Sequence, residues 1–264
     1  MLKPLALSAS RGVIRADDPD GFVAAFRRIA AILARDDVGL SGELAEALLV
    51  EEFIPGREVA LEGLLTTGGL QTLALFDKPD PLDGPFFEET IYVTPSRLPA
   101  ATQARIADVT LRACAALGLT EGPVHAELRV NDAGPWVVEV AARSIGGLCS
   151  RTLRFGTGMT LEELILRHAL GWKIDSFDRE RQAAGVMMIP IPRAGRLVAV
   201  HGQDAAEDLP GVEEIAITAH LGQELIPLPE GWQYLGFIFA RGDSPEEVEQ
   251  ALRRAHARLA FDIA

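Results

Sequence analysis

The chain has 264 residues, of which 48% are hydrophobic, enough apolar material for a substantial core in one large domain or two to three small ones. Its net charge of −13, from 25 basic and 38 acidic residues, excludes the basic surface that binds nucleic acid or an anionic membrane. No apolar run approaches the roughly 18 to 20 residues of a membrane span, and the N-terminus lacks a signal-peptide pattern, so we expect a cytoplasmic protein.

Helix and strand signals alternate in the first half of the chain. Asp18 is a good N-cap in front of Pro19, which predicts a helix over residues 19–35. Its apolar residues recur at helical spacing and predict one buried face: Phe22, Phe26, Ile29 and Leu33. Segments 48–53, 57–65 and 70–76 have the composition of strands, the last two joined by a turn at residues 67–69. A second helix is predicted over residues 99–117, closed by Gly118.

The second half contains a hairpin pattern, two capped helices and a group of strands. The hairpin arms are residues 125–130 and 135–140. Capping boxes at residues 160–163 and 244–247 predict helices over 161–170 and 245–260. Strand-like segments between residues 185 and 240, interrupted by prolines, predict a small separate module at the C-terminus.

A loop rich in small residues lies between Lys3 and the first helix. Residues 3–13 offer backbone amides and hydroxyls of the kind that contact a polyphosphate, and Lys3 adds a positive charge. A serine-rich surface loop explains the same residues.

The strand end at residues 51–54 is followed by a Pro-Gly turn and then by Glu58. Exposed backbone groups at such a strand end suit the edge of an adenine ring. A carboxylate accepts hydrogen bonds only, so Glu58 matches the two hydroxyls of a ribose. An acidic strand end followed by an ordinary turn is the alternative interpretation.

Each arm of the hairpin carries one glutamate, Glu127 and Glu139. A three-residue loop over residues 132–134 pairs them directly, whereas a two-residue loop sends them to opposite faces. Only the first register places the side chains about 5 Å apart, where they suit one or two Mg²⁺ ions. We expect that register because Gly134 suits the left-handed position of a three-residue loop. A position of Glu139 on the solvent face explains it without a ligand.

These segments, in this order, resemble the ATP-grasp superfamily of carboxylate-amine ligases over roughly residues 2–180. The corresponding strand of many ATP-grasp ligases has an asparagine two residues after the second glutamate, where this chain has Ala141. The bacterial L-amino acid ligases also lack that asparagine and keep an arginine followed by a glycine pair, as Arg143 and Gly146-Gly147 are here. Residues after 185 resemble their C-terminal module, so the chain is most similar to that branch.

The resemblance implies an α+β fold, namely the ATP-grasp fold with two α+β subdomains that sandwich ATP, and a small C-terminal α+β module. It implies a small lid subdomain over residues 1–50 and a catalytic subdomain over residues 51–180. The third part, residues 181–264, is expected to be a module like that of L-amino acid ligases.

The cofactors that the resemblance implies are ATP and Mg²⁺, with Mn²⁺ as an alternative ion. It assigns the metal to Glu127 and Glu139 and charge stabilisation on the transferring phosphoryl group to Arg143, for which a structural ion pair is the alternative. It assigns adenine to residues 51–54 and ribose to Glu58. The implied nucleotide-binding residues are Lys3, Ser8, Ser10, Arg11, Gly12, Glu51, Glu52, Phe53, Ile54 and Glu58. The loop departs from the family pattern, which has more glycines than the single Gly12.

The implied reaction is an ADP-forming ligation. ATP phosphorylates a substrate carboxylate, an amine attacks the acyl phosphate, and an amide or peptide bond forms. The implied substrates are small carboxylates and amines, with amino acids expected, and residues 77–90 are a candidate substrate loop. A solvated surface loop explains the same segment, and the sequence leaves open whether the chain forms a homodimer.

Intact members of the family have a preceding domain and a further nucleotide-binding lysine. Because Lys3 follows Met1 by two residues, we expect this chain to lack both and to depend on another domain or polypeptide. The alternative hypotheses are a non-catalytic ATP-binding or assembly partner, and another ATP-grasp ligase such as a glycinamide ribonucleotide synthetase or a D-alanine ligase.

Overall fold

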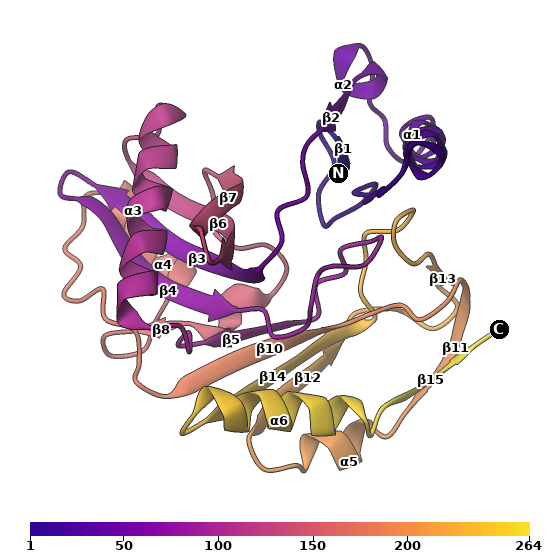
Figure 1. The fold of residues 1–264 in the computed structure, drawn as a ribbon. Coiled ribbons are helices and arrows are strands. Elements are labelled where there is room, and N and C mark those ends of the chain that lie inside the picture. The colour runs from indigo at the N-terminus through magenta and orange to yellow at the C-terminus, as the bar shows by residue number, and fades with distance from the viewer.

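The computed structural model describes residues 1–264, and its main feature is an eight-stranded antiparallel sheet (Figure 1). The strands lie in the order β12-β14-β10-β5-β4-β3-β6-β7. Their bounds are β3 Arg57–Thr66, β4 Gly69–Asp77, β5 Ile91–Thr94, β6 Gly122–Asn131, β7 Gly134–Ala141, β10 Ala183–Ile189, β12 Val212–Ile217 and β14 Gly236–Gly242. The architecture is thus α+β, as the sequence analysis expects.

The C-terminal strands belong to this sheet and not to a separate one. Strand β10 pairs with β5, with Val186 opposite Tyr92, and β14 and β12 continue the sheet beyond it. The sequence pattern predicted these strands but not their pairing with the central sheet, because a strand pattern does not specify its pairing partner. The division of the chain at residues 50 and 180 remains a prediction.

The N-terminal residues form a small layer above the sheet, which we call the lid (Figure 1). It consists of β1 Leu2–Pro4, α1 Pro19–Leu33, α2 Glu43–Glu46 and β2 Leu48–Val50. Asp18 caps α1 by accepting a hydrogen bond from the Gly21 N–H at 2.7 Å. The helix ends two residues earlier than predicted, and β2 ends at Val50 instead of residue 53.

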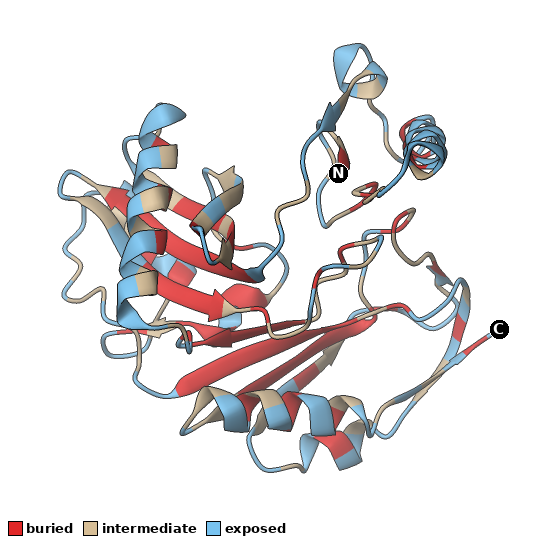
Figure 2. Cartoon of the chain, viewed as in Figure 1, coloured by how far each residue is buried: buried red, intermediate tan, exposed pale blue.

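The buried face of α1 is narrower than the sequence predicts. Ile29 and Leu33 are buried as expected, but Phe22 and Phe26 are 38% and 48% exposed. The helix packs on a two-stranded sheet that offers a small core around Leu2 and Ile14, so its outer aromatic residues have nothing to cover them. Figure 2 shows this outer face in pale blue.

Helices and loops cover both faces of the central sheet. Helix α3, Ala100–Ala116, buries Ile106 and Cys114 against one face. The other face is covered by a segment with the 3₁₀ turn η1 Cys149–Thr152, the short strands β8 Arg154–Phe155 and β9 Met159–Thr160, and α4 Leu161–Ala169. The Thr160 hydroxyl caps α4 at the predicted start by accepting from the Glu163 N–H at 3.1 Å.

The C-terminal residues add a second small sheet, β13-β11-β15, and two helices. Their bounds are β11 Gly195–His201, α5 Gln203–Glu207, β13 Glu224–Leu225, α6 Pro245–His256 and β15 Ala260–Ile263. Helix α6 starts after Ser244 as predicted but ends at His256, because the chain turns into β15. The longest helix, α3, has 17 residues, and no helix combines the length and apolarity of a membrane span.

The β6–β7 hairpin pairs Glu127 with Glu139, as the sequence analysis expected, but for a different reason. The turn has two central residues, Asp132 and Ala133, not three. Near the turn Asn131 pairs with Gly134, and the register then shifts by one residue between Leu128–Val137 and Glu127–Glu139. The extra residue, Val138, forms a β-bulge that returns both glutamates to one face.

Candidate functional site

A cavity of ≈ 1690 Å³ lies between the lid, the central sheet and the C-terminal segment. It is larger than the roughly 300–1,000 Å³ of a typical small-molecule site. All the sequence-predicted site residues except Gly12 line it. They are Lys3, Ser8, Ser10, Arg11, Glu51, Glu52, Phe53, Ile54, Glu58, Glu127, Glu139 and Arg143.

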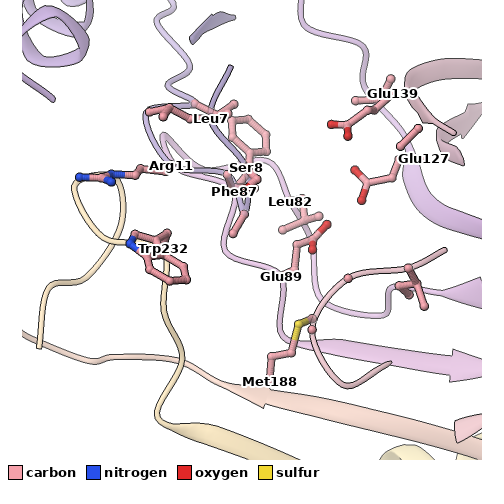
Figure 3. A pocket seen from close by; sticks show the side chains of 18 of the residues that line it. Leu7, Ser8, Arg11, Leu82, Phe87, Glu89, Glu127, Glu139, Met188 and Trp232 are labelled. Atoms are coloured by element: carbon pink, nitrogen blue, oxygen red, sulfur yellow. The ribbon is translucent and has the colours of Figure 1, made fainter. Parts of the chain in front are cut away.

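The carboxylates of Glu127 and Glu139 point to the same side of the cavity (Figure 3). They are partners in the β6–β7 ladder, so their side chains start about 5 Å apart. Glu139 is exposed and has no hydrogen bond or ion pair with another residue. Carboxylate oxygens are the ligands that Mg²⁺ prefers, so this donor set fits the ion that the fold family implies.

Glu127 also belongs to a buried charge cluster on the floor of the cavity. Lys78 at the end of β4 places Nζ 2.8 Å from Glu58, 2.5 Å from Glu89 and 3.2 Å from Glu127. Oxygens of these three glutamates lie within 4.8 Å of one another, a separation that suits a metal ion. The ammonium group of Lys78 contacts all three, so it is the cation that they share.

The protonation of the cluster follows from its burial. Burial opposes the charge on Lys78, but Glu127 and Glu89 outweigh burial and raise the pKa of Lys78 well above its ordinary value. Burial, reinforced by the charge of Glu127, raises the pKa of Glu89 to about 7. Burial also disfavours the ionised form of Glu127, yet Lys78 and His125 lower its pKa below the ordinary value. Of Glu89 and Glu127, therefore, Glu127 is the one that stays ionised.

Glu58, the predicted ribose ligand, is buried and paired on both oxygens. Lys78 contacts Oε1, and Arg129 Nε donates to Oε2 at 2.9 Å. Arg129 also donates to the Ile54 carbonyl at 3.0 Å, so it joins Glu58 to the predicted adenine segment. An ionised carboxylate has about four acceptor positions, so these two contacts leave Glu58 capable of accepting further hydrogen bonds.

The lid loop faces the cavity in an unusual backbone conformation. Ala9 and Ser10 have φ angles of 54° and 56°, in the left-handed region that glycine enters most easily. The loop thus adopts the conformation of a glycine-rich loop with only one glycine. Lys3 lies at its start, on β1, and forms an ion pair at 2.6 Å with Glu51, which directly follows the paired strand β2.

Arg11 and Gly12 make contacts away from the centre of the cavity. Arg11 donates to Asp37 at 2.7 Å, and Figure 3 shows its guanidinium group turned away from Glu127 and Glu139. Gly12 donates its N–H to the Pro229 carbonyl at 2.9 Å. A side chain at position 12 would approach Pro4 to 2.8 Å, so the glycine serves the packing of the loop.

Arg143 lies on the loop after β7 and is exposed. Its guanidinium group donates to the Ser144 carbonyl at 2.9 Å and has no carboxylate partner. The alternative interpretation of Arg143 as half of a structural ion pair is therefore wrong. The loop is held instead by Glu62, which accepts from the Ile145 N–H at 3.0 Å.

Sequence reasoning assigned no individual role to Lys78, Glu89, Arg129, Glu62 or His125. His125 contacts Glu62 through Nδ1 and lies 3.4 Å from Glu127 through Nε2. Burial opposes its charge, but the hydrogen bonds with Glu127 and Glu62 raise the pKa of His125 to about 9. The available signal was a charged residue within or next to an apolar strand, since such a residue needs a partner.

Known proteins resemble this chain in sequence and in fold. A family model described as ATP-grasp domain matches residues 1–152, and another described as L-amino acid ligase C-terminal domain 2 matches residues 187–264. The crystal structure of an L-amino acid ligase from Bacillus licheniformis is similar to all of this chain, with a TM-score of 0.82 and 29% identity.

Two curated proteins show related sequences. Carnosine synthase 1 of Gallus gallus is 32% identical over 157 residues, which are 58% of this chain and 17% of that protein. Alanine–anticapsin ligase of Bacillus subtilis is 25% identical over 63% of this chain and 37% of its own length. The chain spans 64% of the Bacillus licheniformis ligase structure.

Proposed function

Because the chain belongs to the ATP-grasp family, as a ligase related to L-amino acid ligases, we propose that it supplies the nucleotide and metal site of an ADP-forming carboxylate-amine ligase. Its substrates in this proposal are amino acids, which it joins through an acyl phosphate. The observation that carries the proposal is the pairing of Glu127 with Glu139 on one face of the sheet, beside an unpaired Arg143 in the same cavity.

In the proposed reaction a substrate carboxylate oxygen attacks the γ-phosphorus of ATP. The bond from that phosphorus to the β–γ bridging oxygen breaks, and ADP leaves. The amine nitrogen then attacks the acyl carbon, phosphate leaves with the electron pair of the broken C–O bond, and the nitrogen loses a proton to give the amide. No protein nucleophile is needed, because the activated group is the carboxylate of the substrate itself.

The side chains divide this work by position. Glu127 and Glu139 would hold Mg²⁺, which neutralises phosphate charge when it is bound. Arg143 has free guanidinium donors for the transferring phosphoryl group. In the proposal Lys3, Ser8 and Ser10 face the polyphosphate, residues 51–54 face adenine and Glu58 faces ribose. We assign Arg11 and Gly12 to the shape of the lid loop, since their contacts go to Asp37 and Pro229.

The chain's similarity to L-amino acid ligases at both ends favours amino acids as substrates. The ATP-grasp match alone is compatible with other carboxylate-amine ligases. The C-terminal match over residues 187–264 and the 29% identity to the Bacillus licheniformis enzyme favour the L-amino acid ligase branch.

The test is phosphate release from Mg-ATP by the 264-residue chain in the presence of a mixture of L-amino acids. Three proteins are compared: wild type, Glu139→Gln, and Glu43→Gln as a control on an exposed glutamate outside the cavity. We expect release that requires amino acids, that survives in Glu43→Gln, and that falls at least 100-fold in Glu139→Gln, roughly the loss of one transition-state contact.

Two other outcomes would change the assignment. ATP binding without release, measured by equilibrium dialysis, would favour the alternative of a nucleotide-binding partner. Release that proceeds equally well in Glu139→Gln would contradict the assignment of the metal to the β6–β7 ladder.

A further inference from the structure

Charged side chains are concentrated on one side of the cavity, whereas apolar side chains line both sides. The lid, the central sheet and its loops contribute nearly all the charged residues of the lining, including Lys3, Glu58, Glu127 and Arg143. The C-terminal segment contributes one acidic residue, Glu224, and otherwise apolar, aromatic and neutral polar side chains. The two ends of the cavity are therefore suited to different chemical groups.

Three aromatic residues on and before β14 form the apolar end, and we call them the aromatic wall: Trp232, Tyr234 and Phe237. The rings of Tyr234 and Phe237 lie 6.3 Å apart, and Phe237 stacks on Phe239 at 6.3 Å with an interplanar angle of 16°. Met188 from the neighbouring β10 lines the same end. Figure 3 shows Trp232 and Met188 on the far side of Glu89 from the Glu127–Glu139 pair.

The aromatic wall borders the proposed reaction centre. A methyl group built on Gly147 would lie 3.4 Å from the Phe237 ring, so the loop that carries Arg143 packs directly on the wall. Phe237 is therefore a direct neighbour of the loop that carries Arg143. Tyr234 lines the same cavity as Glu89 and Arg143.

Contacts with the lid hold the segment that leads into the wall. Arg28 of α1 binds both oxygens of Glu230, at 2.5 and 2.9 Å. Gly12 of the lid loop donates to the Pro229 carbonyl at 2.9 Å. Gly231 has no room for a side chain, since a methyl group there would approach the Ile226 carbonyl to 1.7 Å. These contacts fix the backbone of residues 229–231, which directly precede Trp232.

We propose that the aromatic wall binds the side chain of a large apolar or aromatic amino-acid substrate and thereby determines which amino acids the ligase joins. The proposal rests on the proposed function, and it names the substrate class of that site. The size of the cavity supports it, because ≈ 1690 Å³ exceeds the typical volume for one small ligand and leaves room beside a nucleotide. Aromatic rings offer apolar contact over a large area without demanding a polar partner.

The experiment compares wild type with Trp232→Ala and Phe237→Leu, the second chosen because a leucine keeps the buried position of Phe237 filled. Trp172→Ala is the control, since Trp172 is 62% exposed and does not line the cavity. KM and kcat for Mg-ATP-dependent phosphate release are measured with phenylalanine, leucine, methionine, alanine and glycine. We expect KM for the three large amino acids to rise by about tenfold or more in both wall variants, and KM for alanine and glycine to change by less than about twofold.

An equal change in KM for all five amino acids, or no change, would overturn the proposal. Equilibrium dialysis of labelled phenylalanine, with Mg²⁺ and a non-hydrolysable ATP analogue, gives a second readout that does not need turnover. If no amino acid stimulates phosphate release, the proposed function fails. Dialysis then still tests whether the aromatic wall binds phenylalanine. Phenylalanine that binds wild type and Trp172→Ala but not the wall variants supports the proposal; absent or unchanged binding refutes it.

Discussion

The buried charge cluster of Glu58, Lys78, Glu89, Glu127 and Arg129 and the ion pairs of the lid use the same kinds of residues at similar distances. Lys78 lies 2.8 Å from Glu58, and Arg28 lies 2.5 Å from Glu230. The difference is solvent: the side chains of Lys78 and Glu58 are 3% and 7% exposed, whereas those of Arg28 and Glu230 are 44% and 30% exposed. Short distance alone therefore says little about what a pair contributes.

Burial makes the cluster interdependent. Each charge there is desolvated and is compensated only by its neighbours, so the removal of one partner leaves an uncompensated charge in a poorly solvated site. In the Arg28–Glu230 pair each charge keeps access to water, and an exposed pair contributes about 1 kcal/mol or less. We therefore expect the cluster to contribute strongly to stability and the Arg28–Glu230 pair to contribute weakly.

The largest effect is expected for Lys78→Met, which removes the cation shared by Glu58, Glu89 and Glu127. Loss of a buried partner typically costs about 3–5 kcal/mol, and urea denaturation in the presence of a metal chelator measures it. Lys173→Met is the matched control, because the pair of Lys173 with Asp175 is highly exposed. A loss within 1 kcal/mol of the control would mean that the cluster is more solvated or more protonated than its burial indicates.

A smaller effect is expected for Arg129→Met. This change removes hydrogen bonds to Glu58, to the Ile54 carbonyl and to the Leu82 carbonyl, but Glu58 keeps its contact with Lys78. We expect a loss of about 2 kcal/mol, measured in the same way. Arg112→Met, whose arginine is 69% exposed, should change stability by less than about 0.5 kcal/mol. If the two substitutions lowered the free energy of unfolding equally, burial would not explain the contribution of Arg129.

The lid pair should contribute little and should depend on pH and salt. A hydrogen bond from Arg28 lowers the pKa of Glu230 below its ordinary value of 4.5, although burial opposes the shift. The stabilisation is therefore present above pH 4.5 and is lost as the pH falls through the lower folded-state value. Wild type should exceed Glu230→Gln by about 1 kcal/mol or less at pH 7, and the difference should shrink at low pH and in 1 M salt. A difference that persists at pH 2 would show that contacts other than charge hold the segment.

The smallest effect on stability is expected for Glu139→Gln, because Glu139 is exposed and unpaired. The melting temperature without metal should match that of Glu43→Gln, while stabilisation by Mg-ATP, measured as a shift in melting temperature, should be lost. A destabilised Glu139→Gln protein in the absence of ligand would place this carboxylate with the buried cluster instead.

Local features of the fold could be predicted from the sequence because they depend on neighbours in the chain. The helix starts after Asp18, Thr160 and Ser244 are confirmed, since each cap is a hydrogen bond to a backbone N–H three residues later. Helix ends were less accurate: the last helix stops at His256, where the next strand begins. The buried face of the first helix was also overestimated, since only the core of the lid decides how many of its apolar residues are covered.

The site was predicted in part. The Glu127–Glu139 pairing is confirmed, but a bulge at Val138 produces it and not the expected three-residue loop. A β-bulge within an apolar strand has no clear sequence pattern, so it could not be predicted. Lys78 was missed because its partners Glu58 and Glu127 lie 20 and 49 residues away in the chain, and no local spacing connects them. The nucleotide and metal roles of the site residues remain proposals.

The sequence by itself determined the family resemblance, the helix caps and part of the cavity lining, because motifs and caps are encoded over a few neighbouring positions. The tertiary structure decided which charges share a partner, which face each glutamate occupies and which strands join the central sheet. These depend on strand pairing and on the removal of water by distant segments, and neither leaves a periodic signal in the chain. The C-terminal strands illustrate this: their composition predicted strands, and only the contact of β10 with β5 placed the aromatic wall beside Arg143.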